Sequence, residues 1–134
     1  MKKFYNAILE KMRDGVSVCF PDFPGCVAGG KNYADAMRQG REALEFHIEG
    51  MLTDGENVPE ESDAAALDEF LSELRGENRI ALLEVEVPDG ERERINVTMP
   101  RYVLRRIDAF AGALNRTRSA FLSEAALAFI RKAN

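Results

Sequence analysis

The sequence predicts an α+β protein built from two small domains, and three features support this. Short alternating runs of apolar and polar residues, separated by turn residues, fill the first 30 positions, as in antiparallel strands. Helical periodicity follows over residues 32–54 and returns beyond residue 100. The charge also reverses: residues 1–91 carry 20 acidic and 9 basic side chains, whereas residues 92–134 carry 3 and 9. An acidic body joined to a basic tail indicates two domains with partners of opposite charge.

The composition is that of a soluble, folded protein. Of the 134 residues, 46% are hydrophobic and 31% are charged, and no apolar run approaches the roughly 20 residues that would span a bilayer. The chain start leads into a strand-like pattern instead of a signal peptide, so we expect a cytoplasmic protein with no membrane partner. Two cysteines, Cys19 and Cys26, and the single histidine, His47, cannot complete a zinc site, so we expect reduced thiols and no metal or cofactor.

The N-terminal domain is predicted to begin as a three-stranded meander. The expected strands span residues 4–10, 16–20 and 26–29. Asp14-Gly15 is a strong hairpin signal between the first two strands. Two prolines and a glycine within residues 21–25 interrupt the ladder before the third strand.

A helix over about residues 32–54 should then cross this meander. Asn32 is a suitable N-cap, and Asp35 three residues later comes close to a capping box. The inward face is expected to consist of Met37, Leu44, Ile48 and Met51, with small residues at Ala36, Gly40 and Ala43. Asp54-Gly55 should end the helix.

The remainder of this domain is expected to hold a loop, a helix and a strand. The second helix begins at a cap provided by Ser62 or Asp63. A strand rich in branched residues follows over residues 80–87. The inward residues of this helix are expected to be Leu67, Phe70, Leu71 and Leu74. A turn signature at residues 88–91 then marks the boundary, which gives domains of 1–88 and 92–134.

The C-terminal domain is predicted to have a β-α-α order. Residues 94–100 alternate polar and apolar, and two helices follow, from about residue 100 and over about 118–132, the second capped by Thr117. One strand and two helices in about 40 residues cannot close a core alone, so two copies should pair through their strands. Over residues 92–132 this pattern resembles the ribbon-helix-helix repressors. The matching pieces are Arg94-Ile95-Asn96-Val97-Thr98-Met99-Pro100, Leu104-x-x-Ile107-Asp108 and Asn115-Arg116-Thr117-Arg118-Ser119.

Such a dimer suggests how operator DNA would be bound. With Ile95, Val97 and Met99 inward, the outward residues of the ribbon are Arg94, Asn96 and Thr98. A two-stranded ribbon fits the major groove, where Arg94 suits guanine and Asn96 suits adenine. The backbone amides of Arg118 and Ser119 after the Thr117 cap suit a phosphate, with Arg116 nearby. The alternative is a dimerisation module whose arginines are only solvated.

The N-terminal domain has a family resemblance of its own. Val18-Cys19-Phe20-Pro21-Asp22-Phe23-Pro24-Gly25-Cys26-Val27 resembles the signature of HicB-type antitoxins, as do Arg41-Glu42-Ala43-Leu44-Glu45, Glu49-Gly50 and Met51-Leu52-Thr53-Asp54-Gly55-Glu56 followed by Pro59. The resemblance implies a partial RNase H-like fold without catalysis. It also implies binding of a HicA-type toxin, a small basic mRNA-cleaving RNase, and repression of the shared operon.

A basic toxin is a reasonable partner for an acidic domain, since complementary charge speeds encounter. The expected contact is the loop Phe20, Pro21, Asp22, Phe23 and Pro24, although its two phenylalanines could equally fill the core. Whether such dimers pair into higher oligomers is left open by the sequence.

Catalysis is not expected. RNase H chemistry gathers several carboxylates around two metal ions. Here the first strand carries only Glu10 at its end, Asp22 lies in a proline-bound loop and His47 is in the middle of a helix, so no clustered set is visible. Two other functions compete with the antitoxin. One is a stand-alone regulator whose N-terminal domain senses a ligand or protein, and the other is a divergent nuclease.

Overall fold

The structure is a computed structural model that describes residues 1–74 and 76–134. Contacts divide the chain into two compact units. The first comprises residues 1–51 and 57–89, and the second comprises residues 52–56 and 90–134. The short segment 52–56, which the sequence pattern groups with the N-terminal domain, therefore belongs to the second unit.

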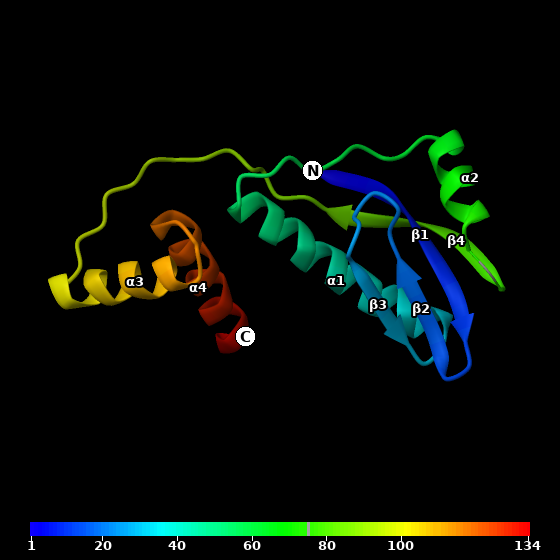
Figure 1. Ribbon diagram of the computed structural model, residues 1–134, viewed down its shortest axis with the longest axis horizontal. Helices are drawn as coiled ribbons and strands as arrows, with labels where there is room; N and C mark the ends of the chain where they lie inside the picture. The colour runs from blue at the N-terminus through cyan, green and yellow to red at the C-terminus, as the bar shows by residue number, and fades with distance from the viewer. Residues whose placement is uncertain (75) are drawn as a thin grey trace. The chain divides into compact units, whose positions relative to one another are not determined.

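The first unit is organised around a four-stranded antiparallel sheet with the order β3-β2-β1-β4 (Figure 1). The strands are β1 (Lys2–Met12), β2 (Gly15–Cys19), β3 (Val27–Gly30) and β4 (Asn78–Glu86). The predicted meander and the predicted fourth strand are confirmed, and β4 pairs with β1 from Lys2↔Glu86 to Glu10↔Asn78. Gly15 closes the first hairpin at φ 154°, where an added Cβ would lie 2.4 Å from the carbonyl oxygen of Gly30. This turn therefore requires glycine.

Helix α1 (Tyr33–Thr53) lies along one face of this sheet (Figure 1). Gly40 permits the close approach, because a Cβ there would lie 3.0 Å from Cγ1 of Val18 on β2. The predicted cap is confirmed: Asn32 Oδ1 accepts from the amide of Asp35 at 2.8 Å. The Asp35 carboxylate accepts in return from the amide of Lys31 at 2.9 Å, one residue earlier than a standard capping box.

The core of the first unit lies between α1 and the sheet. Its most deeply buried large side chains include Tyr5, Phe23, Leu44, Ile48, Val18 and Val85. Helix α2 (Ala64–Ser72) precedes β4 and contributes only half-buried apolar side chains. Asp63, not Ser62, is its N-cap, and its carboxylate accepts from the amide of Ala66 at 2.9 Å.

The second unit contains α3 (Arg101–Ala113) and α4 (Arg118–Ala133), both within a residue or two of the predicted ranges. The turn between them passes through Asn115, a non-glycine residue at φ 57°, and the amide of Arg116 donates to the carbonyl of Ala111 at 2.8 Å. Asparagine tolerates this left-handed backbone better than most residues do.

The strand expected at residues 94–100 is not formed in the single chain, so this prediction is wrong for the isolated copy. A strand is held by hydrogen bonds to a neighbouring strand. The expected neighbour is the same segment of a second copy, and one chain does not provide it.

Candidate nucleic-acid interface

The segment that precedes α3 presents both of its faces to solvent. The polar residues Arg94, Asn96 and Thr98 are exposed, as the sequence predicts for base readout. The alternating apolar residues are exposed as well, since Ile95 and Val97 retain 73% and 64% of their accessible surface. A stretch that alternates polar and apolar residues yet buries neither face has an apolar side available for pairing.

Helices α3 and α4 pack on each other through a small contact. Ala111 and Ala120 are buried, and the rings of Phe110 and Phe121 meet edge to face with centroids 5.6 Å apart. Large apolar side chains that remain more than half exposed are Tyr102, Phe110, Leu114, Phe129 and Ile130. The second unit thus holds only part of a core, and exposed apolar surface of this extent usually marks an interaction site.

The start of α4 is built as the sequence predicts. Thr117 Oγ1 accepts from the amide of Ala120 at 3.1 Å, which confirms the predicted cap. The first amides of an α-helix have no hydrogen-bond acceptor within the helix and form its positive end. In α4 these are the amides of Arg118 and Ser119. This is the geometry by which helix N-termini receive anions.

The guanidinium of Arg118, whose backbone amide is the predicted phosphate contact, is paired with a carboxylate. Its Nε and Nη2 donate to the two oxygens of Asp108 on α3 at 2.9 and 2.8 Å. The hydrogen bond from Arg118 lowers the pKa of Asp108, and the same bond raises the pKa of Arg118. The side chain of Arg118 therefore links α4 to α3, so its backbone amide is the part placed for an anion.

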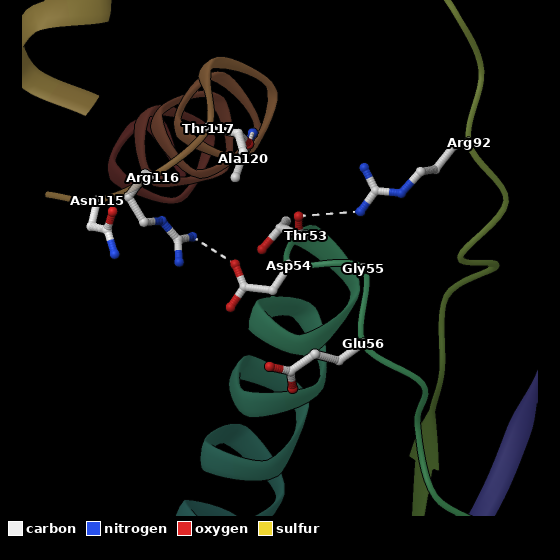
Figure 2. A pocket seen from close by; sticks show the side chains of 9 residues that line it. All are labelled: Thr53, Asp54, Gly55, Glu56, Arg92, Asn115, Arg116, Thr117 and Ala120. Atoms are coloured by element: carbon white, nitrogen blue, oxygen red, sulfur yellow. Dashed lines mark hydrogen bonds and ion pairs between the residues drawn. The ribbon is translucent and has the colours of Figure 1, made fainter. Parts of the chain in front are cut away.

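The guanidinium of Arg116 is also paired with carboxylates. Its Nη2 lies 2.8 Å from Oδ1 of Asp54 and also contacts Glu124 of α4. Arg116 and Asp54 line an open pocket of about 510 Å³ in the second unit, which is drawn in Figure 2. Its lining comprises Thr53, Asp54, Gly55, Glu56, Arg92, Asn115, Arg116, Thr117 and Ala120.

Arg92 completes this arrangement and was not predicted as a functional residue, nor was Asp54. The Arg92 guanidinium donates to the carbonyl oxygen of Leu52 at 3.0 Å. It also donates to that of Thr53 at 3.3 Å, the bond drawn in Figure 2. These carbonyls lie at the end of α1, where the last turn of a helix has carbonyls without a helical partner. In the sequence, Asp54-Gly55 indicates a helix stop and nothing more.

The loop expected to contact a toxin has both of its phenylalanines in the core. Phe20 and Phe23 are 2% and 1% exposed. The Phe23 ring meets the edge of Tyr5 with centroids 4.7 Å apart and that of His47 at 5.9 Å. The sequence allowed the two phenylalanines to contact a toxin or to fill the core, and the structure places both in the core. Of this loop, Pro21 and Asp22 are partly exposed and Pro24 is exposed.

Polar contacts hold the same loop in place. Asp22 accepts a hydrogen bond from the hydroxyl of Ser62, and the Tyr5 hydroxyl donates to the carbonyl of Pro59 at 2.6 Å. Burial raises the pKa of Tyr5, and the nearby Glu60, Asp22 and Glu61 carboxylates add to the effect. The bond to Asp22 fixes the segment before α2 against the β2–β3 loop, and the bond from Tyr5 fixes it against β1.

The comparison with known families identifies the chain. The sequence profile of a family described as a HicB-like antitoxin of bacterial toxin–antitoxin systems matches residues 5–126. The chain belongs to the HicB-like antitoxin family. A protein from the rep–hol intergenic region of Haemophilus phage HP1 is 35% identical over 127 residues, which is 91% of this chain and 93% of the phage protein.

Solved structures of this family share the fold of the chain. The crystal structure of the Burkholderia pseudomallei antitoxin HicB is 31% identical and matches with a TM-score of 0.60, covering 98% of this chain and 99% of that one. Antitoxin HicB3 is 26% identical with a TM-score of 0.56 and covers 92% and 94%. Over the described residues, the mixed architecture of a four-stranded antiparallel sheet and four helices is therefore that of HicB structures.

The residues considered for catalysis do not gather in this HicB-like chain. Within residues 1–74 and 76–134, no three His, Cys, Asp or Glu side chains lie close enough to hold a metal ion together. His47 packs against Phe23, and Asp22 bonds to Ser62. Cys19 and Cys26 are free thiols whose pKa values are raised by burial. None of the described helices is long and apolar enough to span a membrane.

Proposed function

We propose that this HicB-like antitoxin neutralises a HicA-type toxin through its first unit and represses its own operon through its second. In the second unit, the proposed state is a ribbon-helix-helix homodimer. The observation that carries the proposal is the alternating segment 94–99, whose Ile95 and Val97 are exposed beside the incomplete core of α3 and α4.

Pairing two copies would give segment 94–99 a neighbouring strand and would complete the core of α3 and α4. The segments 94–99 form an antiparallel ribbon whose apolar residues turn inward, and the exposed rings of α3 and α4 cover each other. The polar residues Arg94, Asn96 and Thr98 then face outward from both strands. Such a ribbon enters the major groove, where arginine reads guanine and asparagine reads adenine.

Phosphate contacts would fix the dimer on the duplex. The amides of Arg118 and Ser119, behind the Thr117 cap, supply donors at the positive end of α4. The Arg116 guanidinium lies next to this helix start and supplies a charge. Contacts of this kind position a protein, whereas the ribbon supplies sequence preference.

Toxin binding is assigned to the first unit. The family is that of antitoxins of toxin–antitoxin systems, and the residues of the first unit, 1–51 and 57–89, carry 17 acidic and 9 basic side chains, a net charge of −8. A sheet covered by α1 supports a partial RNase H-like fold for this unit, used as a binding surface. The exposed Pro24 and the partly exposed Pro21 and Asp22 remain candidate toxin contacts, and Phe20 and Phe23 support them from the core. Both functions place the protein in the cytoplasm.

Co-expression tests the neutralisation. Induction of a HicA-type toxin should arrest growth, and simultaneous expression of the chain should restore it, because the bound toxin cannot reach mRNA. Colony counts with and without the chain measure the effect. The Asn96→Ala variant is the control and should still rescue, since it alters only the DNA-binding ribbon. Failure of the chain both to rescue growth and to co-purify with the toxin would favour a stand-alone regulator.

A further inference from the structure

We propose that Asp54 is a built-in competitor of DNA phosphate, which holds Arg116 and thereby weakens binding of the dimer to DNA. The inference rests on the proposed DNA-binding function and adds a regulatory contact to it. It starts from the ion pair between Asp54 and Arg116, whose partners are 62 positions apart in the chain but lie within the same compact unit.

The segment that carries Asp54 is held at two points. Arg116 binds the Asp54 carboxylate at 2.8 Å, and Arg92 binds the carbonyl oxygens of Leu52 and Thr53 at 3.0 and 3.3 Å. Both arginines are directed toward this segment in Figure 2. The end of a helix carries partial negative charge on these carbonyls. Two arginines of the second unit, Arg92 and Arg116, therefore bind acceptor groups of residues 52–54.

The chemistry of this contact matches that of a phosphate contact. A carboxylate and a phosphate oxygen are both anionic acceptors, and arginine binds either with charge-assisted hydrogen bonds. The pocket joins Asp54 and Glu56 with Asn115, Arg116 and Thr117, the residues that lead into α4. The Arg116 guanidinium would have to leave Asp54 to approach a phosphate at this helix start, so the two anions compete.

The surroundings of Arg116 favour its ion pair with Asp54. The side chains of Arg116 and Asp54 are 25% and 35% exposed, so solvent screens the pair only in part. The hydrogen bond to Asp54 is the largest cause of the raised pKa of Arg116. Glu124 also contacts Arg116, but it lies on α4 itself and moves with the helix start. Asp54 is on a separate segment, so it is the partner that DNA can displace.

Binding of the full-length chain to a duplex from upstream of its own gene tests this competition. We expect Asp54→Asn to tighten binding by about three- to tenfold in a mobility-shift titration, since each exposed ion pair competes weakly and a dimer carries two. Asp68→Asn is the matched control, because it removes the same charge from an exposed position on α2 and should change affinity by less than about twofold. In an Arg116→Gln background, the gain from Asp54→Asn should disappear, as expected for directly coupled residues.

Each outcome has a distinct meaning. Equal affinities of the Asp54→Asn and Asp68→Asn variants would overturn the competition while leaving the proposed DNA binding intact. If Asp54→Asn still tightens DNA binding in the Arg116→Gln background, the competition is overturned too. The gain in affinity would then come from the removal of one negative charge and not from the release of Arg116. Binding by Asp54→Asn alone, with none by the unmodified chain, would support a strong form of the competition. Absence of binding by both would contradict the DNA-binding function and the competition together.

Discussion

Replacing Val97 by aspartate is expected to dissociate the dimer and to abolish DNA binding with it. In the proposed ribbon Val97 turns into the shared core, although in the single chain 64% of its surface is exposed. A carboxylate at this position would be buried without a partner, at a cost of at least about 3 kcal/mol in each chain. Since the dimer carries two, its dissociation constant should rise by roughly ten-thousandfold or more. Sedimentation of the purified chain over a concentration series measures the change.

Thr98→Asp is the matched control for this substitution. It introduces the same carboxylate one position later, where the period of two turns the side chain to the outer face of the ribbon. This variant should remain dimeric, although its added charge would repel DNA. If Val97→Asp sediments as the unmodified chain does, residues 94–99 do not form the dimer ribbon.

Phe23→Ala is expected to destabilise the first unit by about 3–5 kcal/mol, as truncation of a buried aromatic residue does. Phe23 is 1% exposed and packs between Tyr5 and His47. Since domains are stable by only about 5–15 kcal/mol, this loss is large enough to unfold part of the population. Urea denaturation followed by far-UV circular dichroism gives the free energy of unfolding.

Phe46→Ala serves as the comparison, because Phe46 is on α1 but is 62% exposed. It should lower the free energy of unfolding by less than about 1 kcal/mol. Equal effects of the two substitutions would contradict the placement of Phe23 in the core. Any loss of toxin binding by Phe23→Ala has to be judged against its loss of folding.

Local signals in the sequence were sufficient for most of the secondary structure. Asp14-Gly15 marks the first hairpin, Asn32 caps α1 and Thr117 caps α4, and each of these acts within four residues along the chain. Periodicity placed both C-terminal helices to within a residue or two. Such features need no knowledge of distant contacts, so they can be found in a single sequence.

Features that depend on distant contacts were harder to predict. Whether Phe23 is buried depends on Tyr5 and His47, which lie on other elements. The pairing of Arg116 with Asp54 and of Arg118 with Asp108 likewise brings together residues from separate segments. The sequence shows Arg116 and Arg118 at the start of α4, but the carboxylates paired with them cannot be recognised from local patterns.

The most direct test of the account is sequence-specific binding of the chain to the DNA upstream of its own gene. A footprint of the full-length chain should cover a symmetric pair of half-sites, since the dimer places Arg94, Asn96 and Thr98 on both strands of the ribbon. Asn96→Ala should weaken binding there by about tenfold or more and reduce the preference over unrelated DNA, since each base contact contributes about 1–3 kcal/mol. Unchanged affinity and preference in this variant would contradict readout by the ribbon.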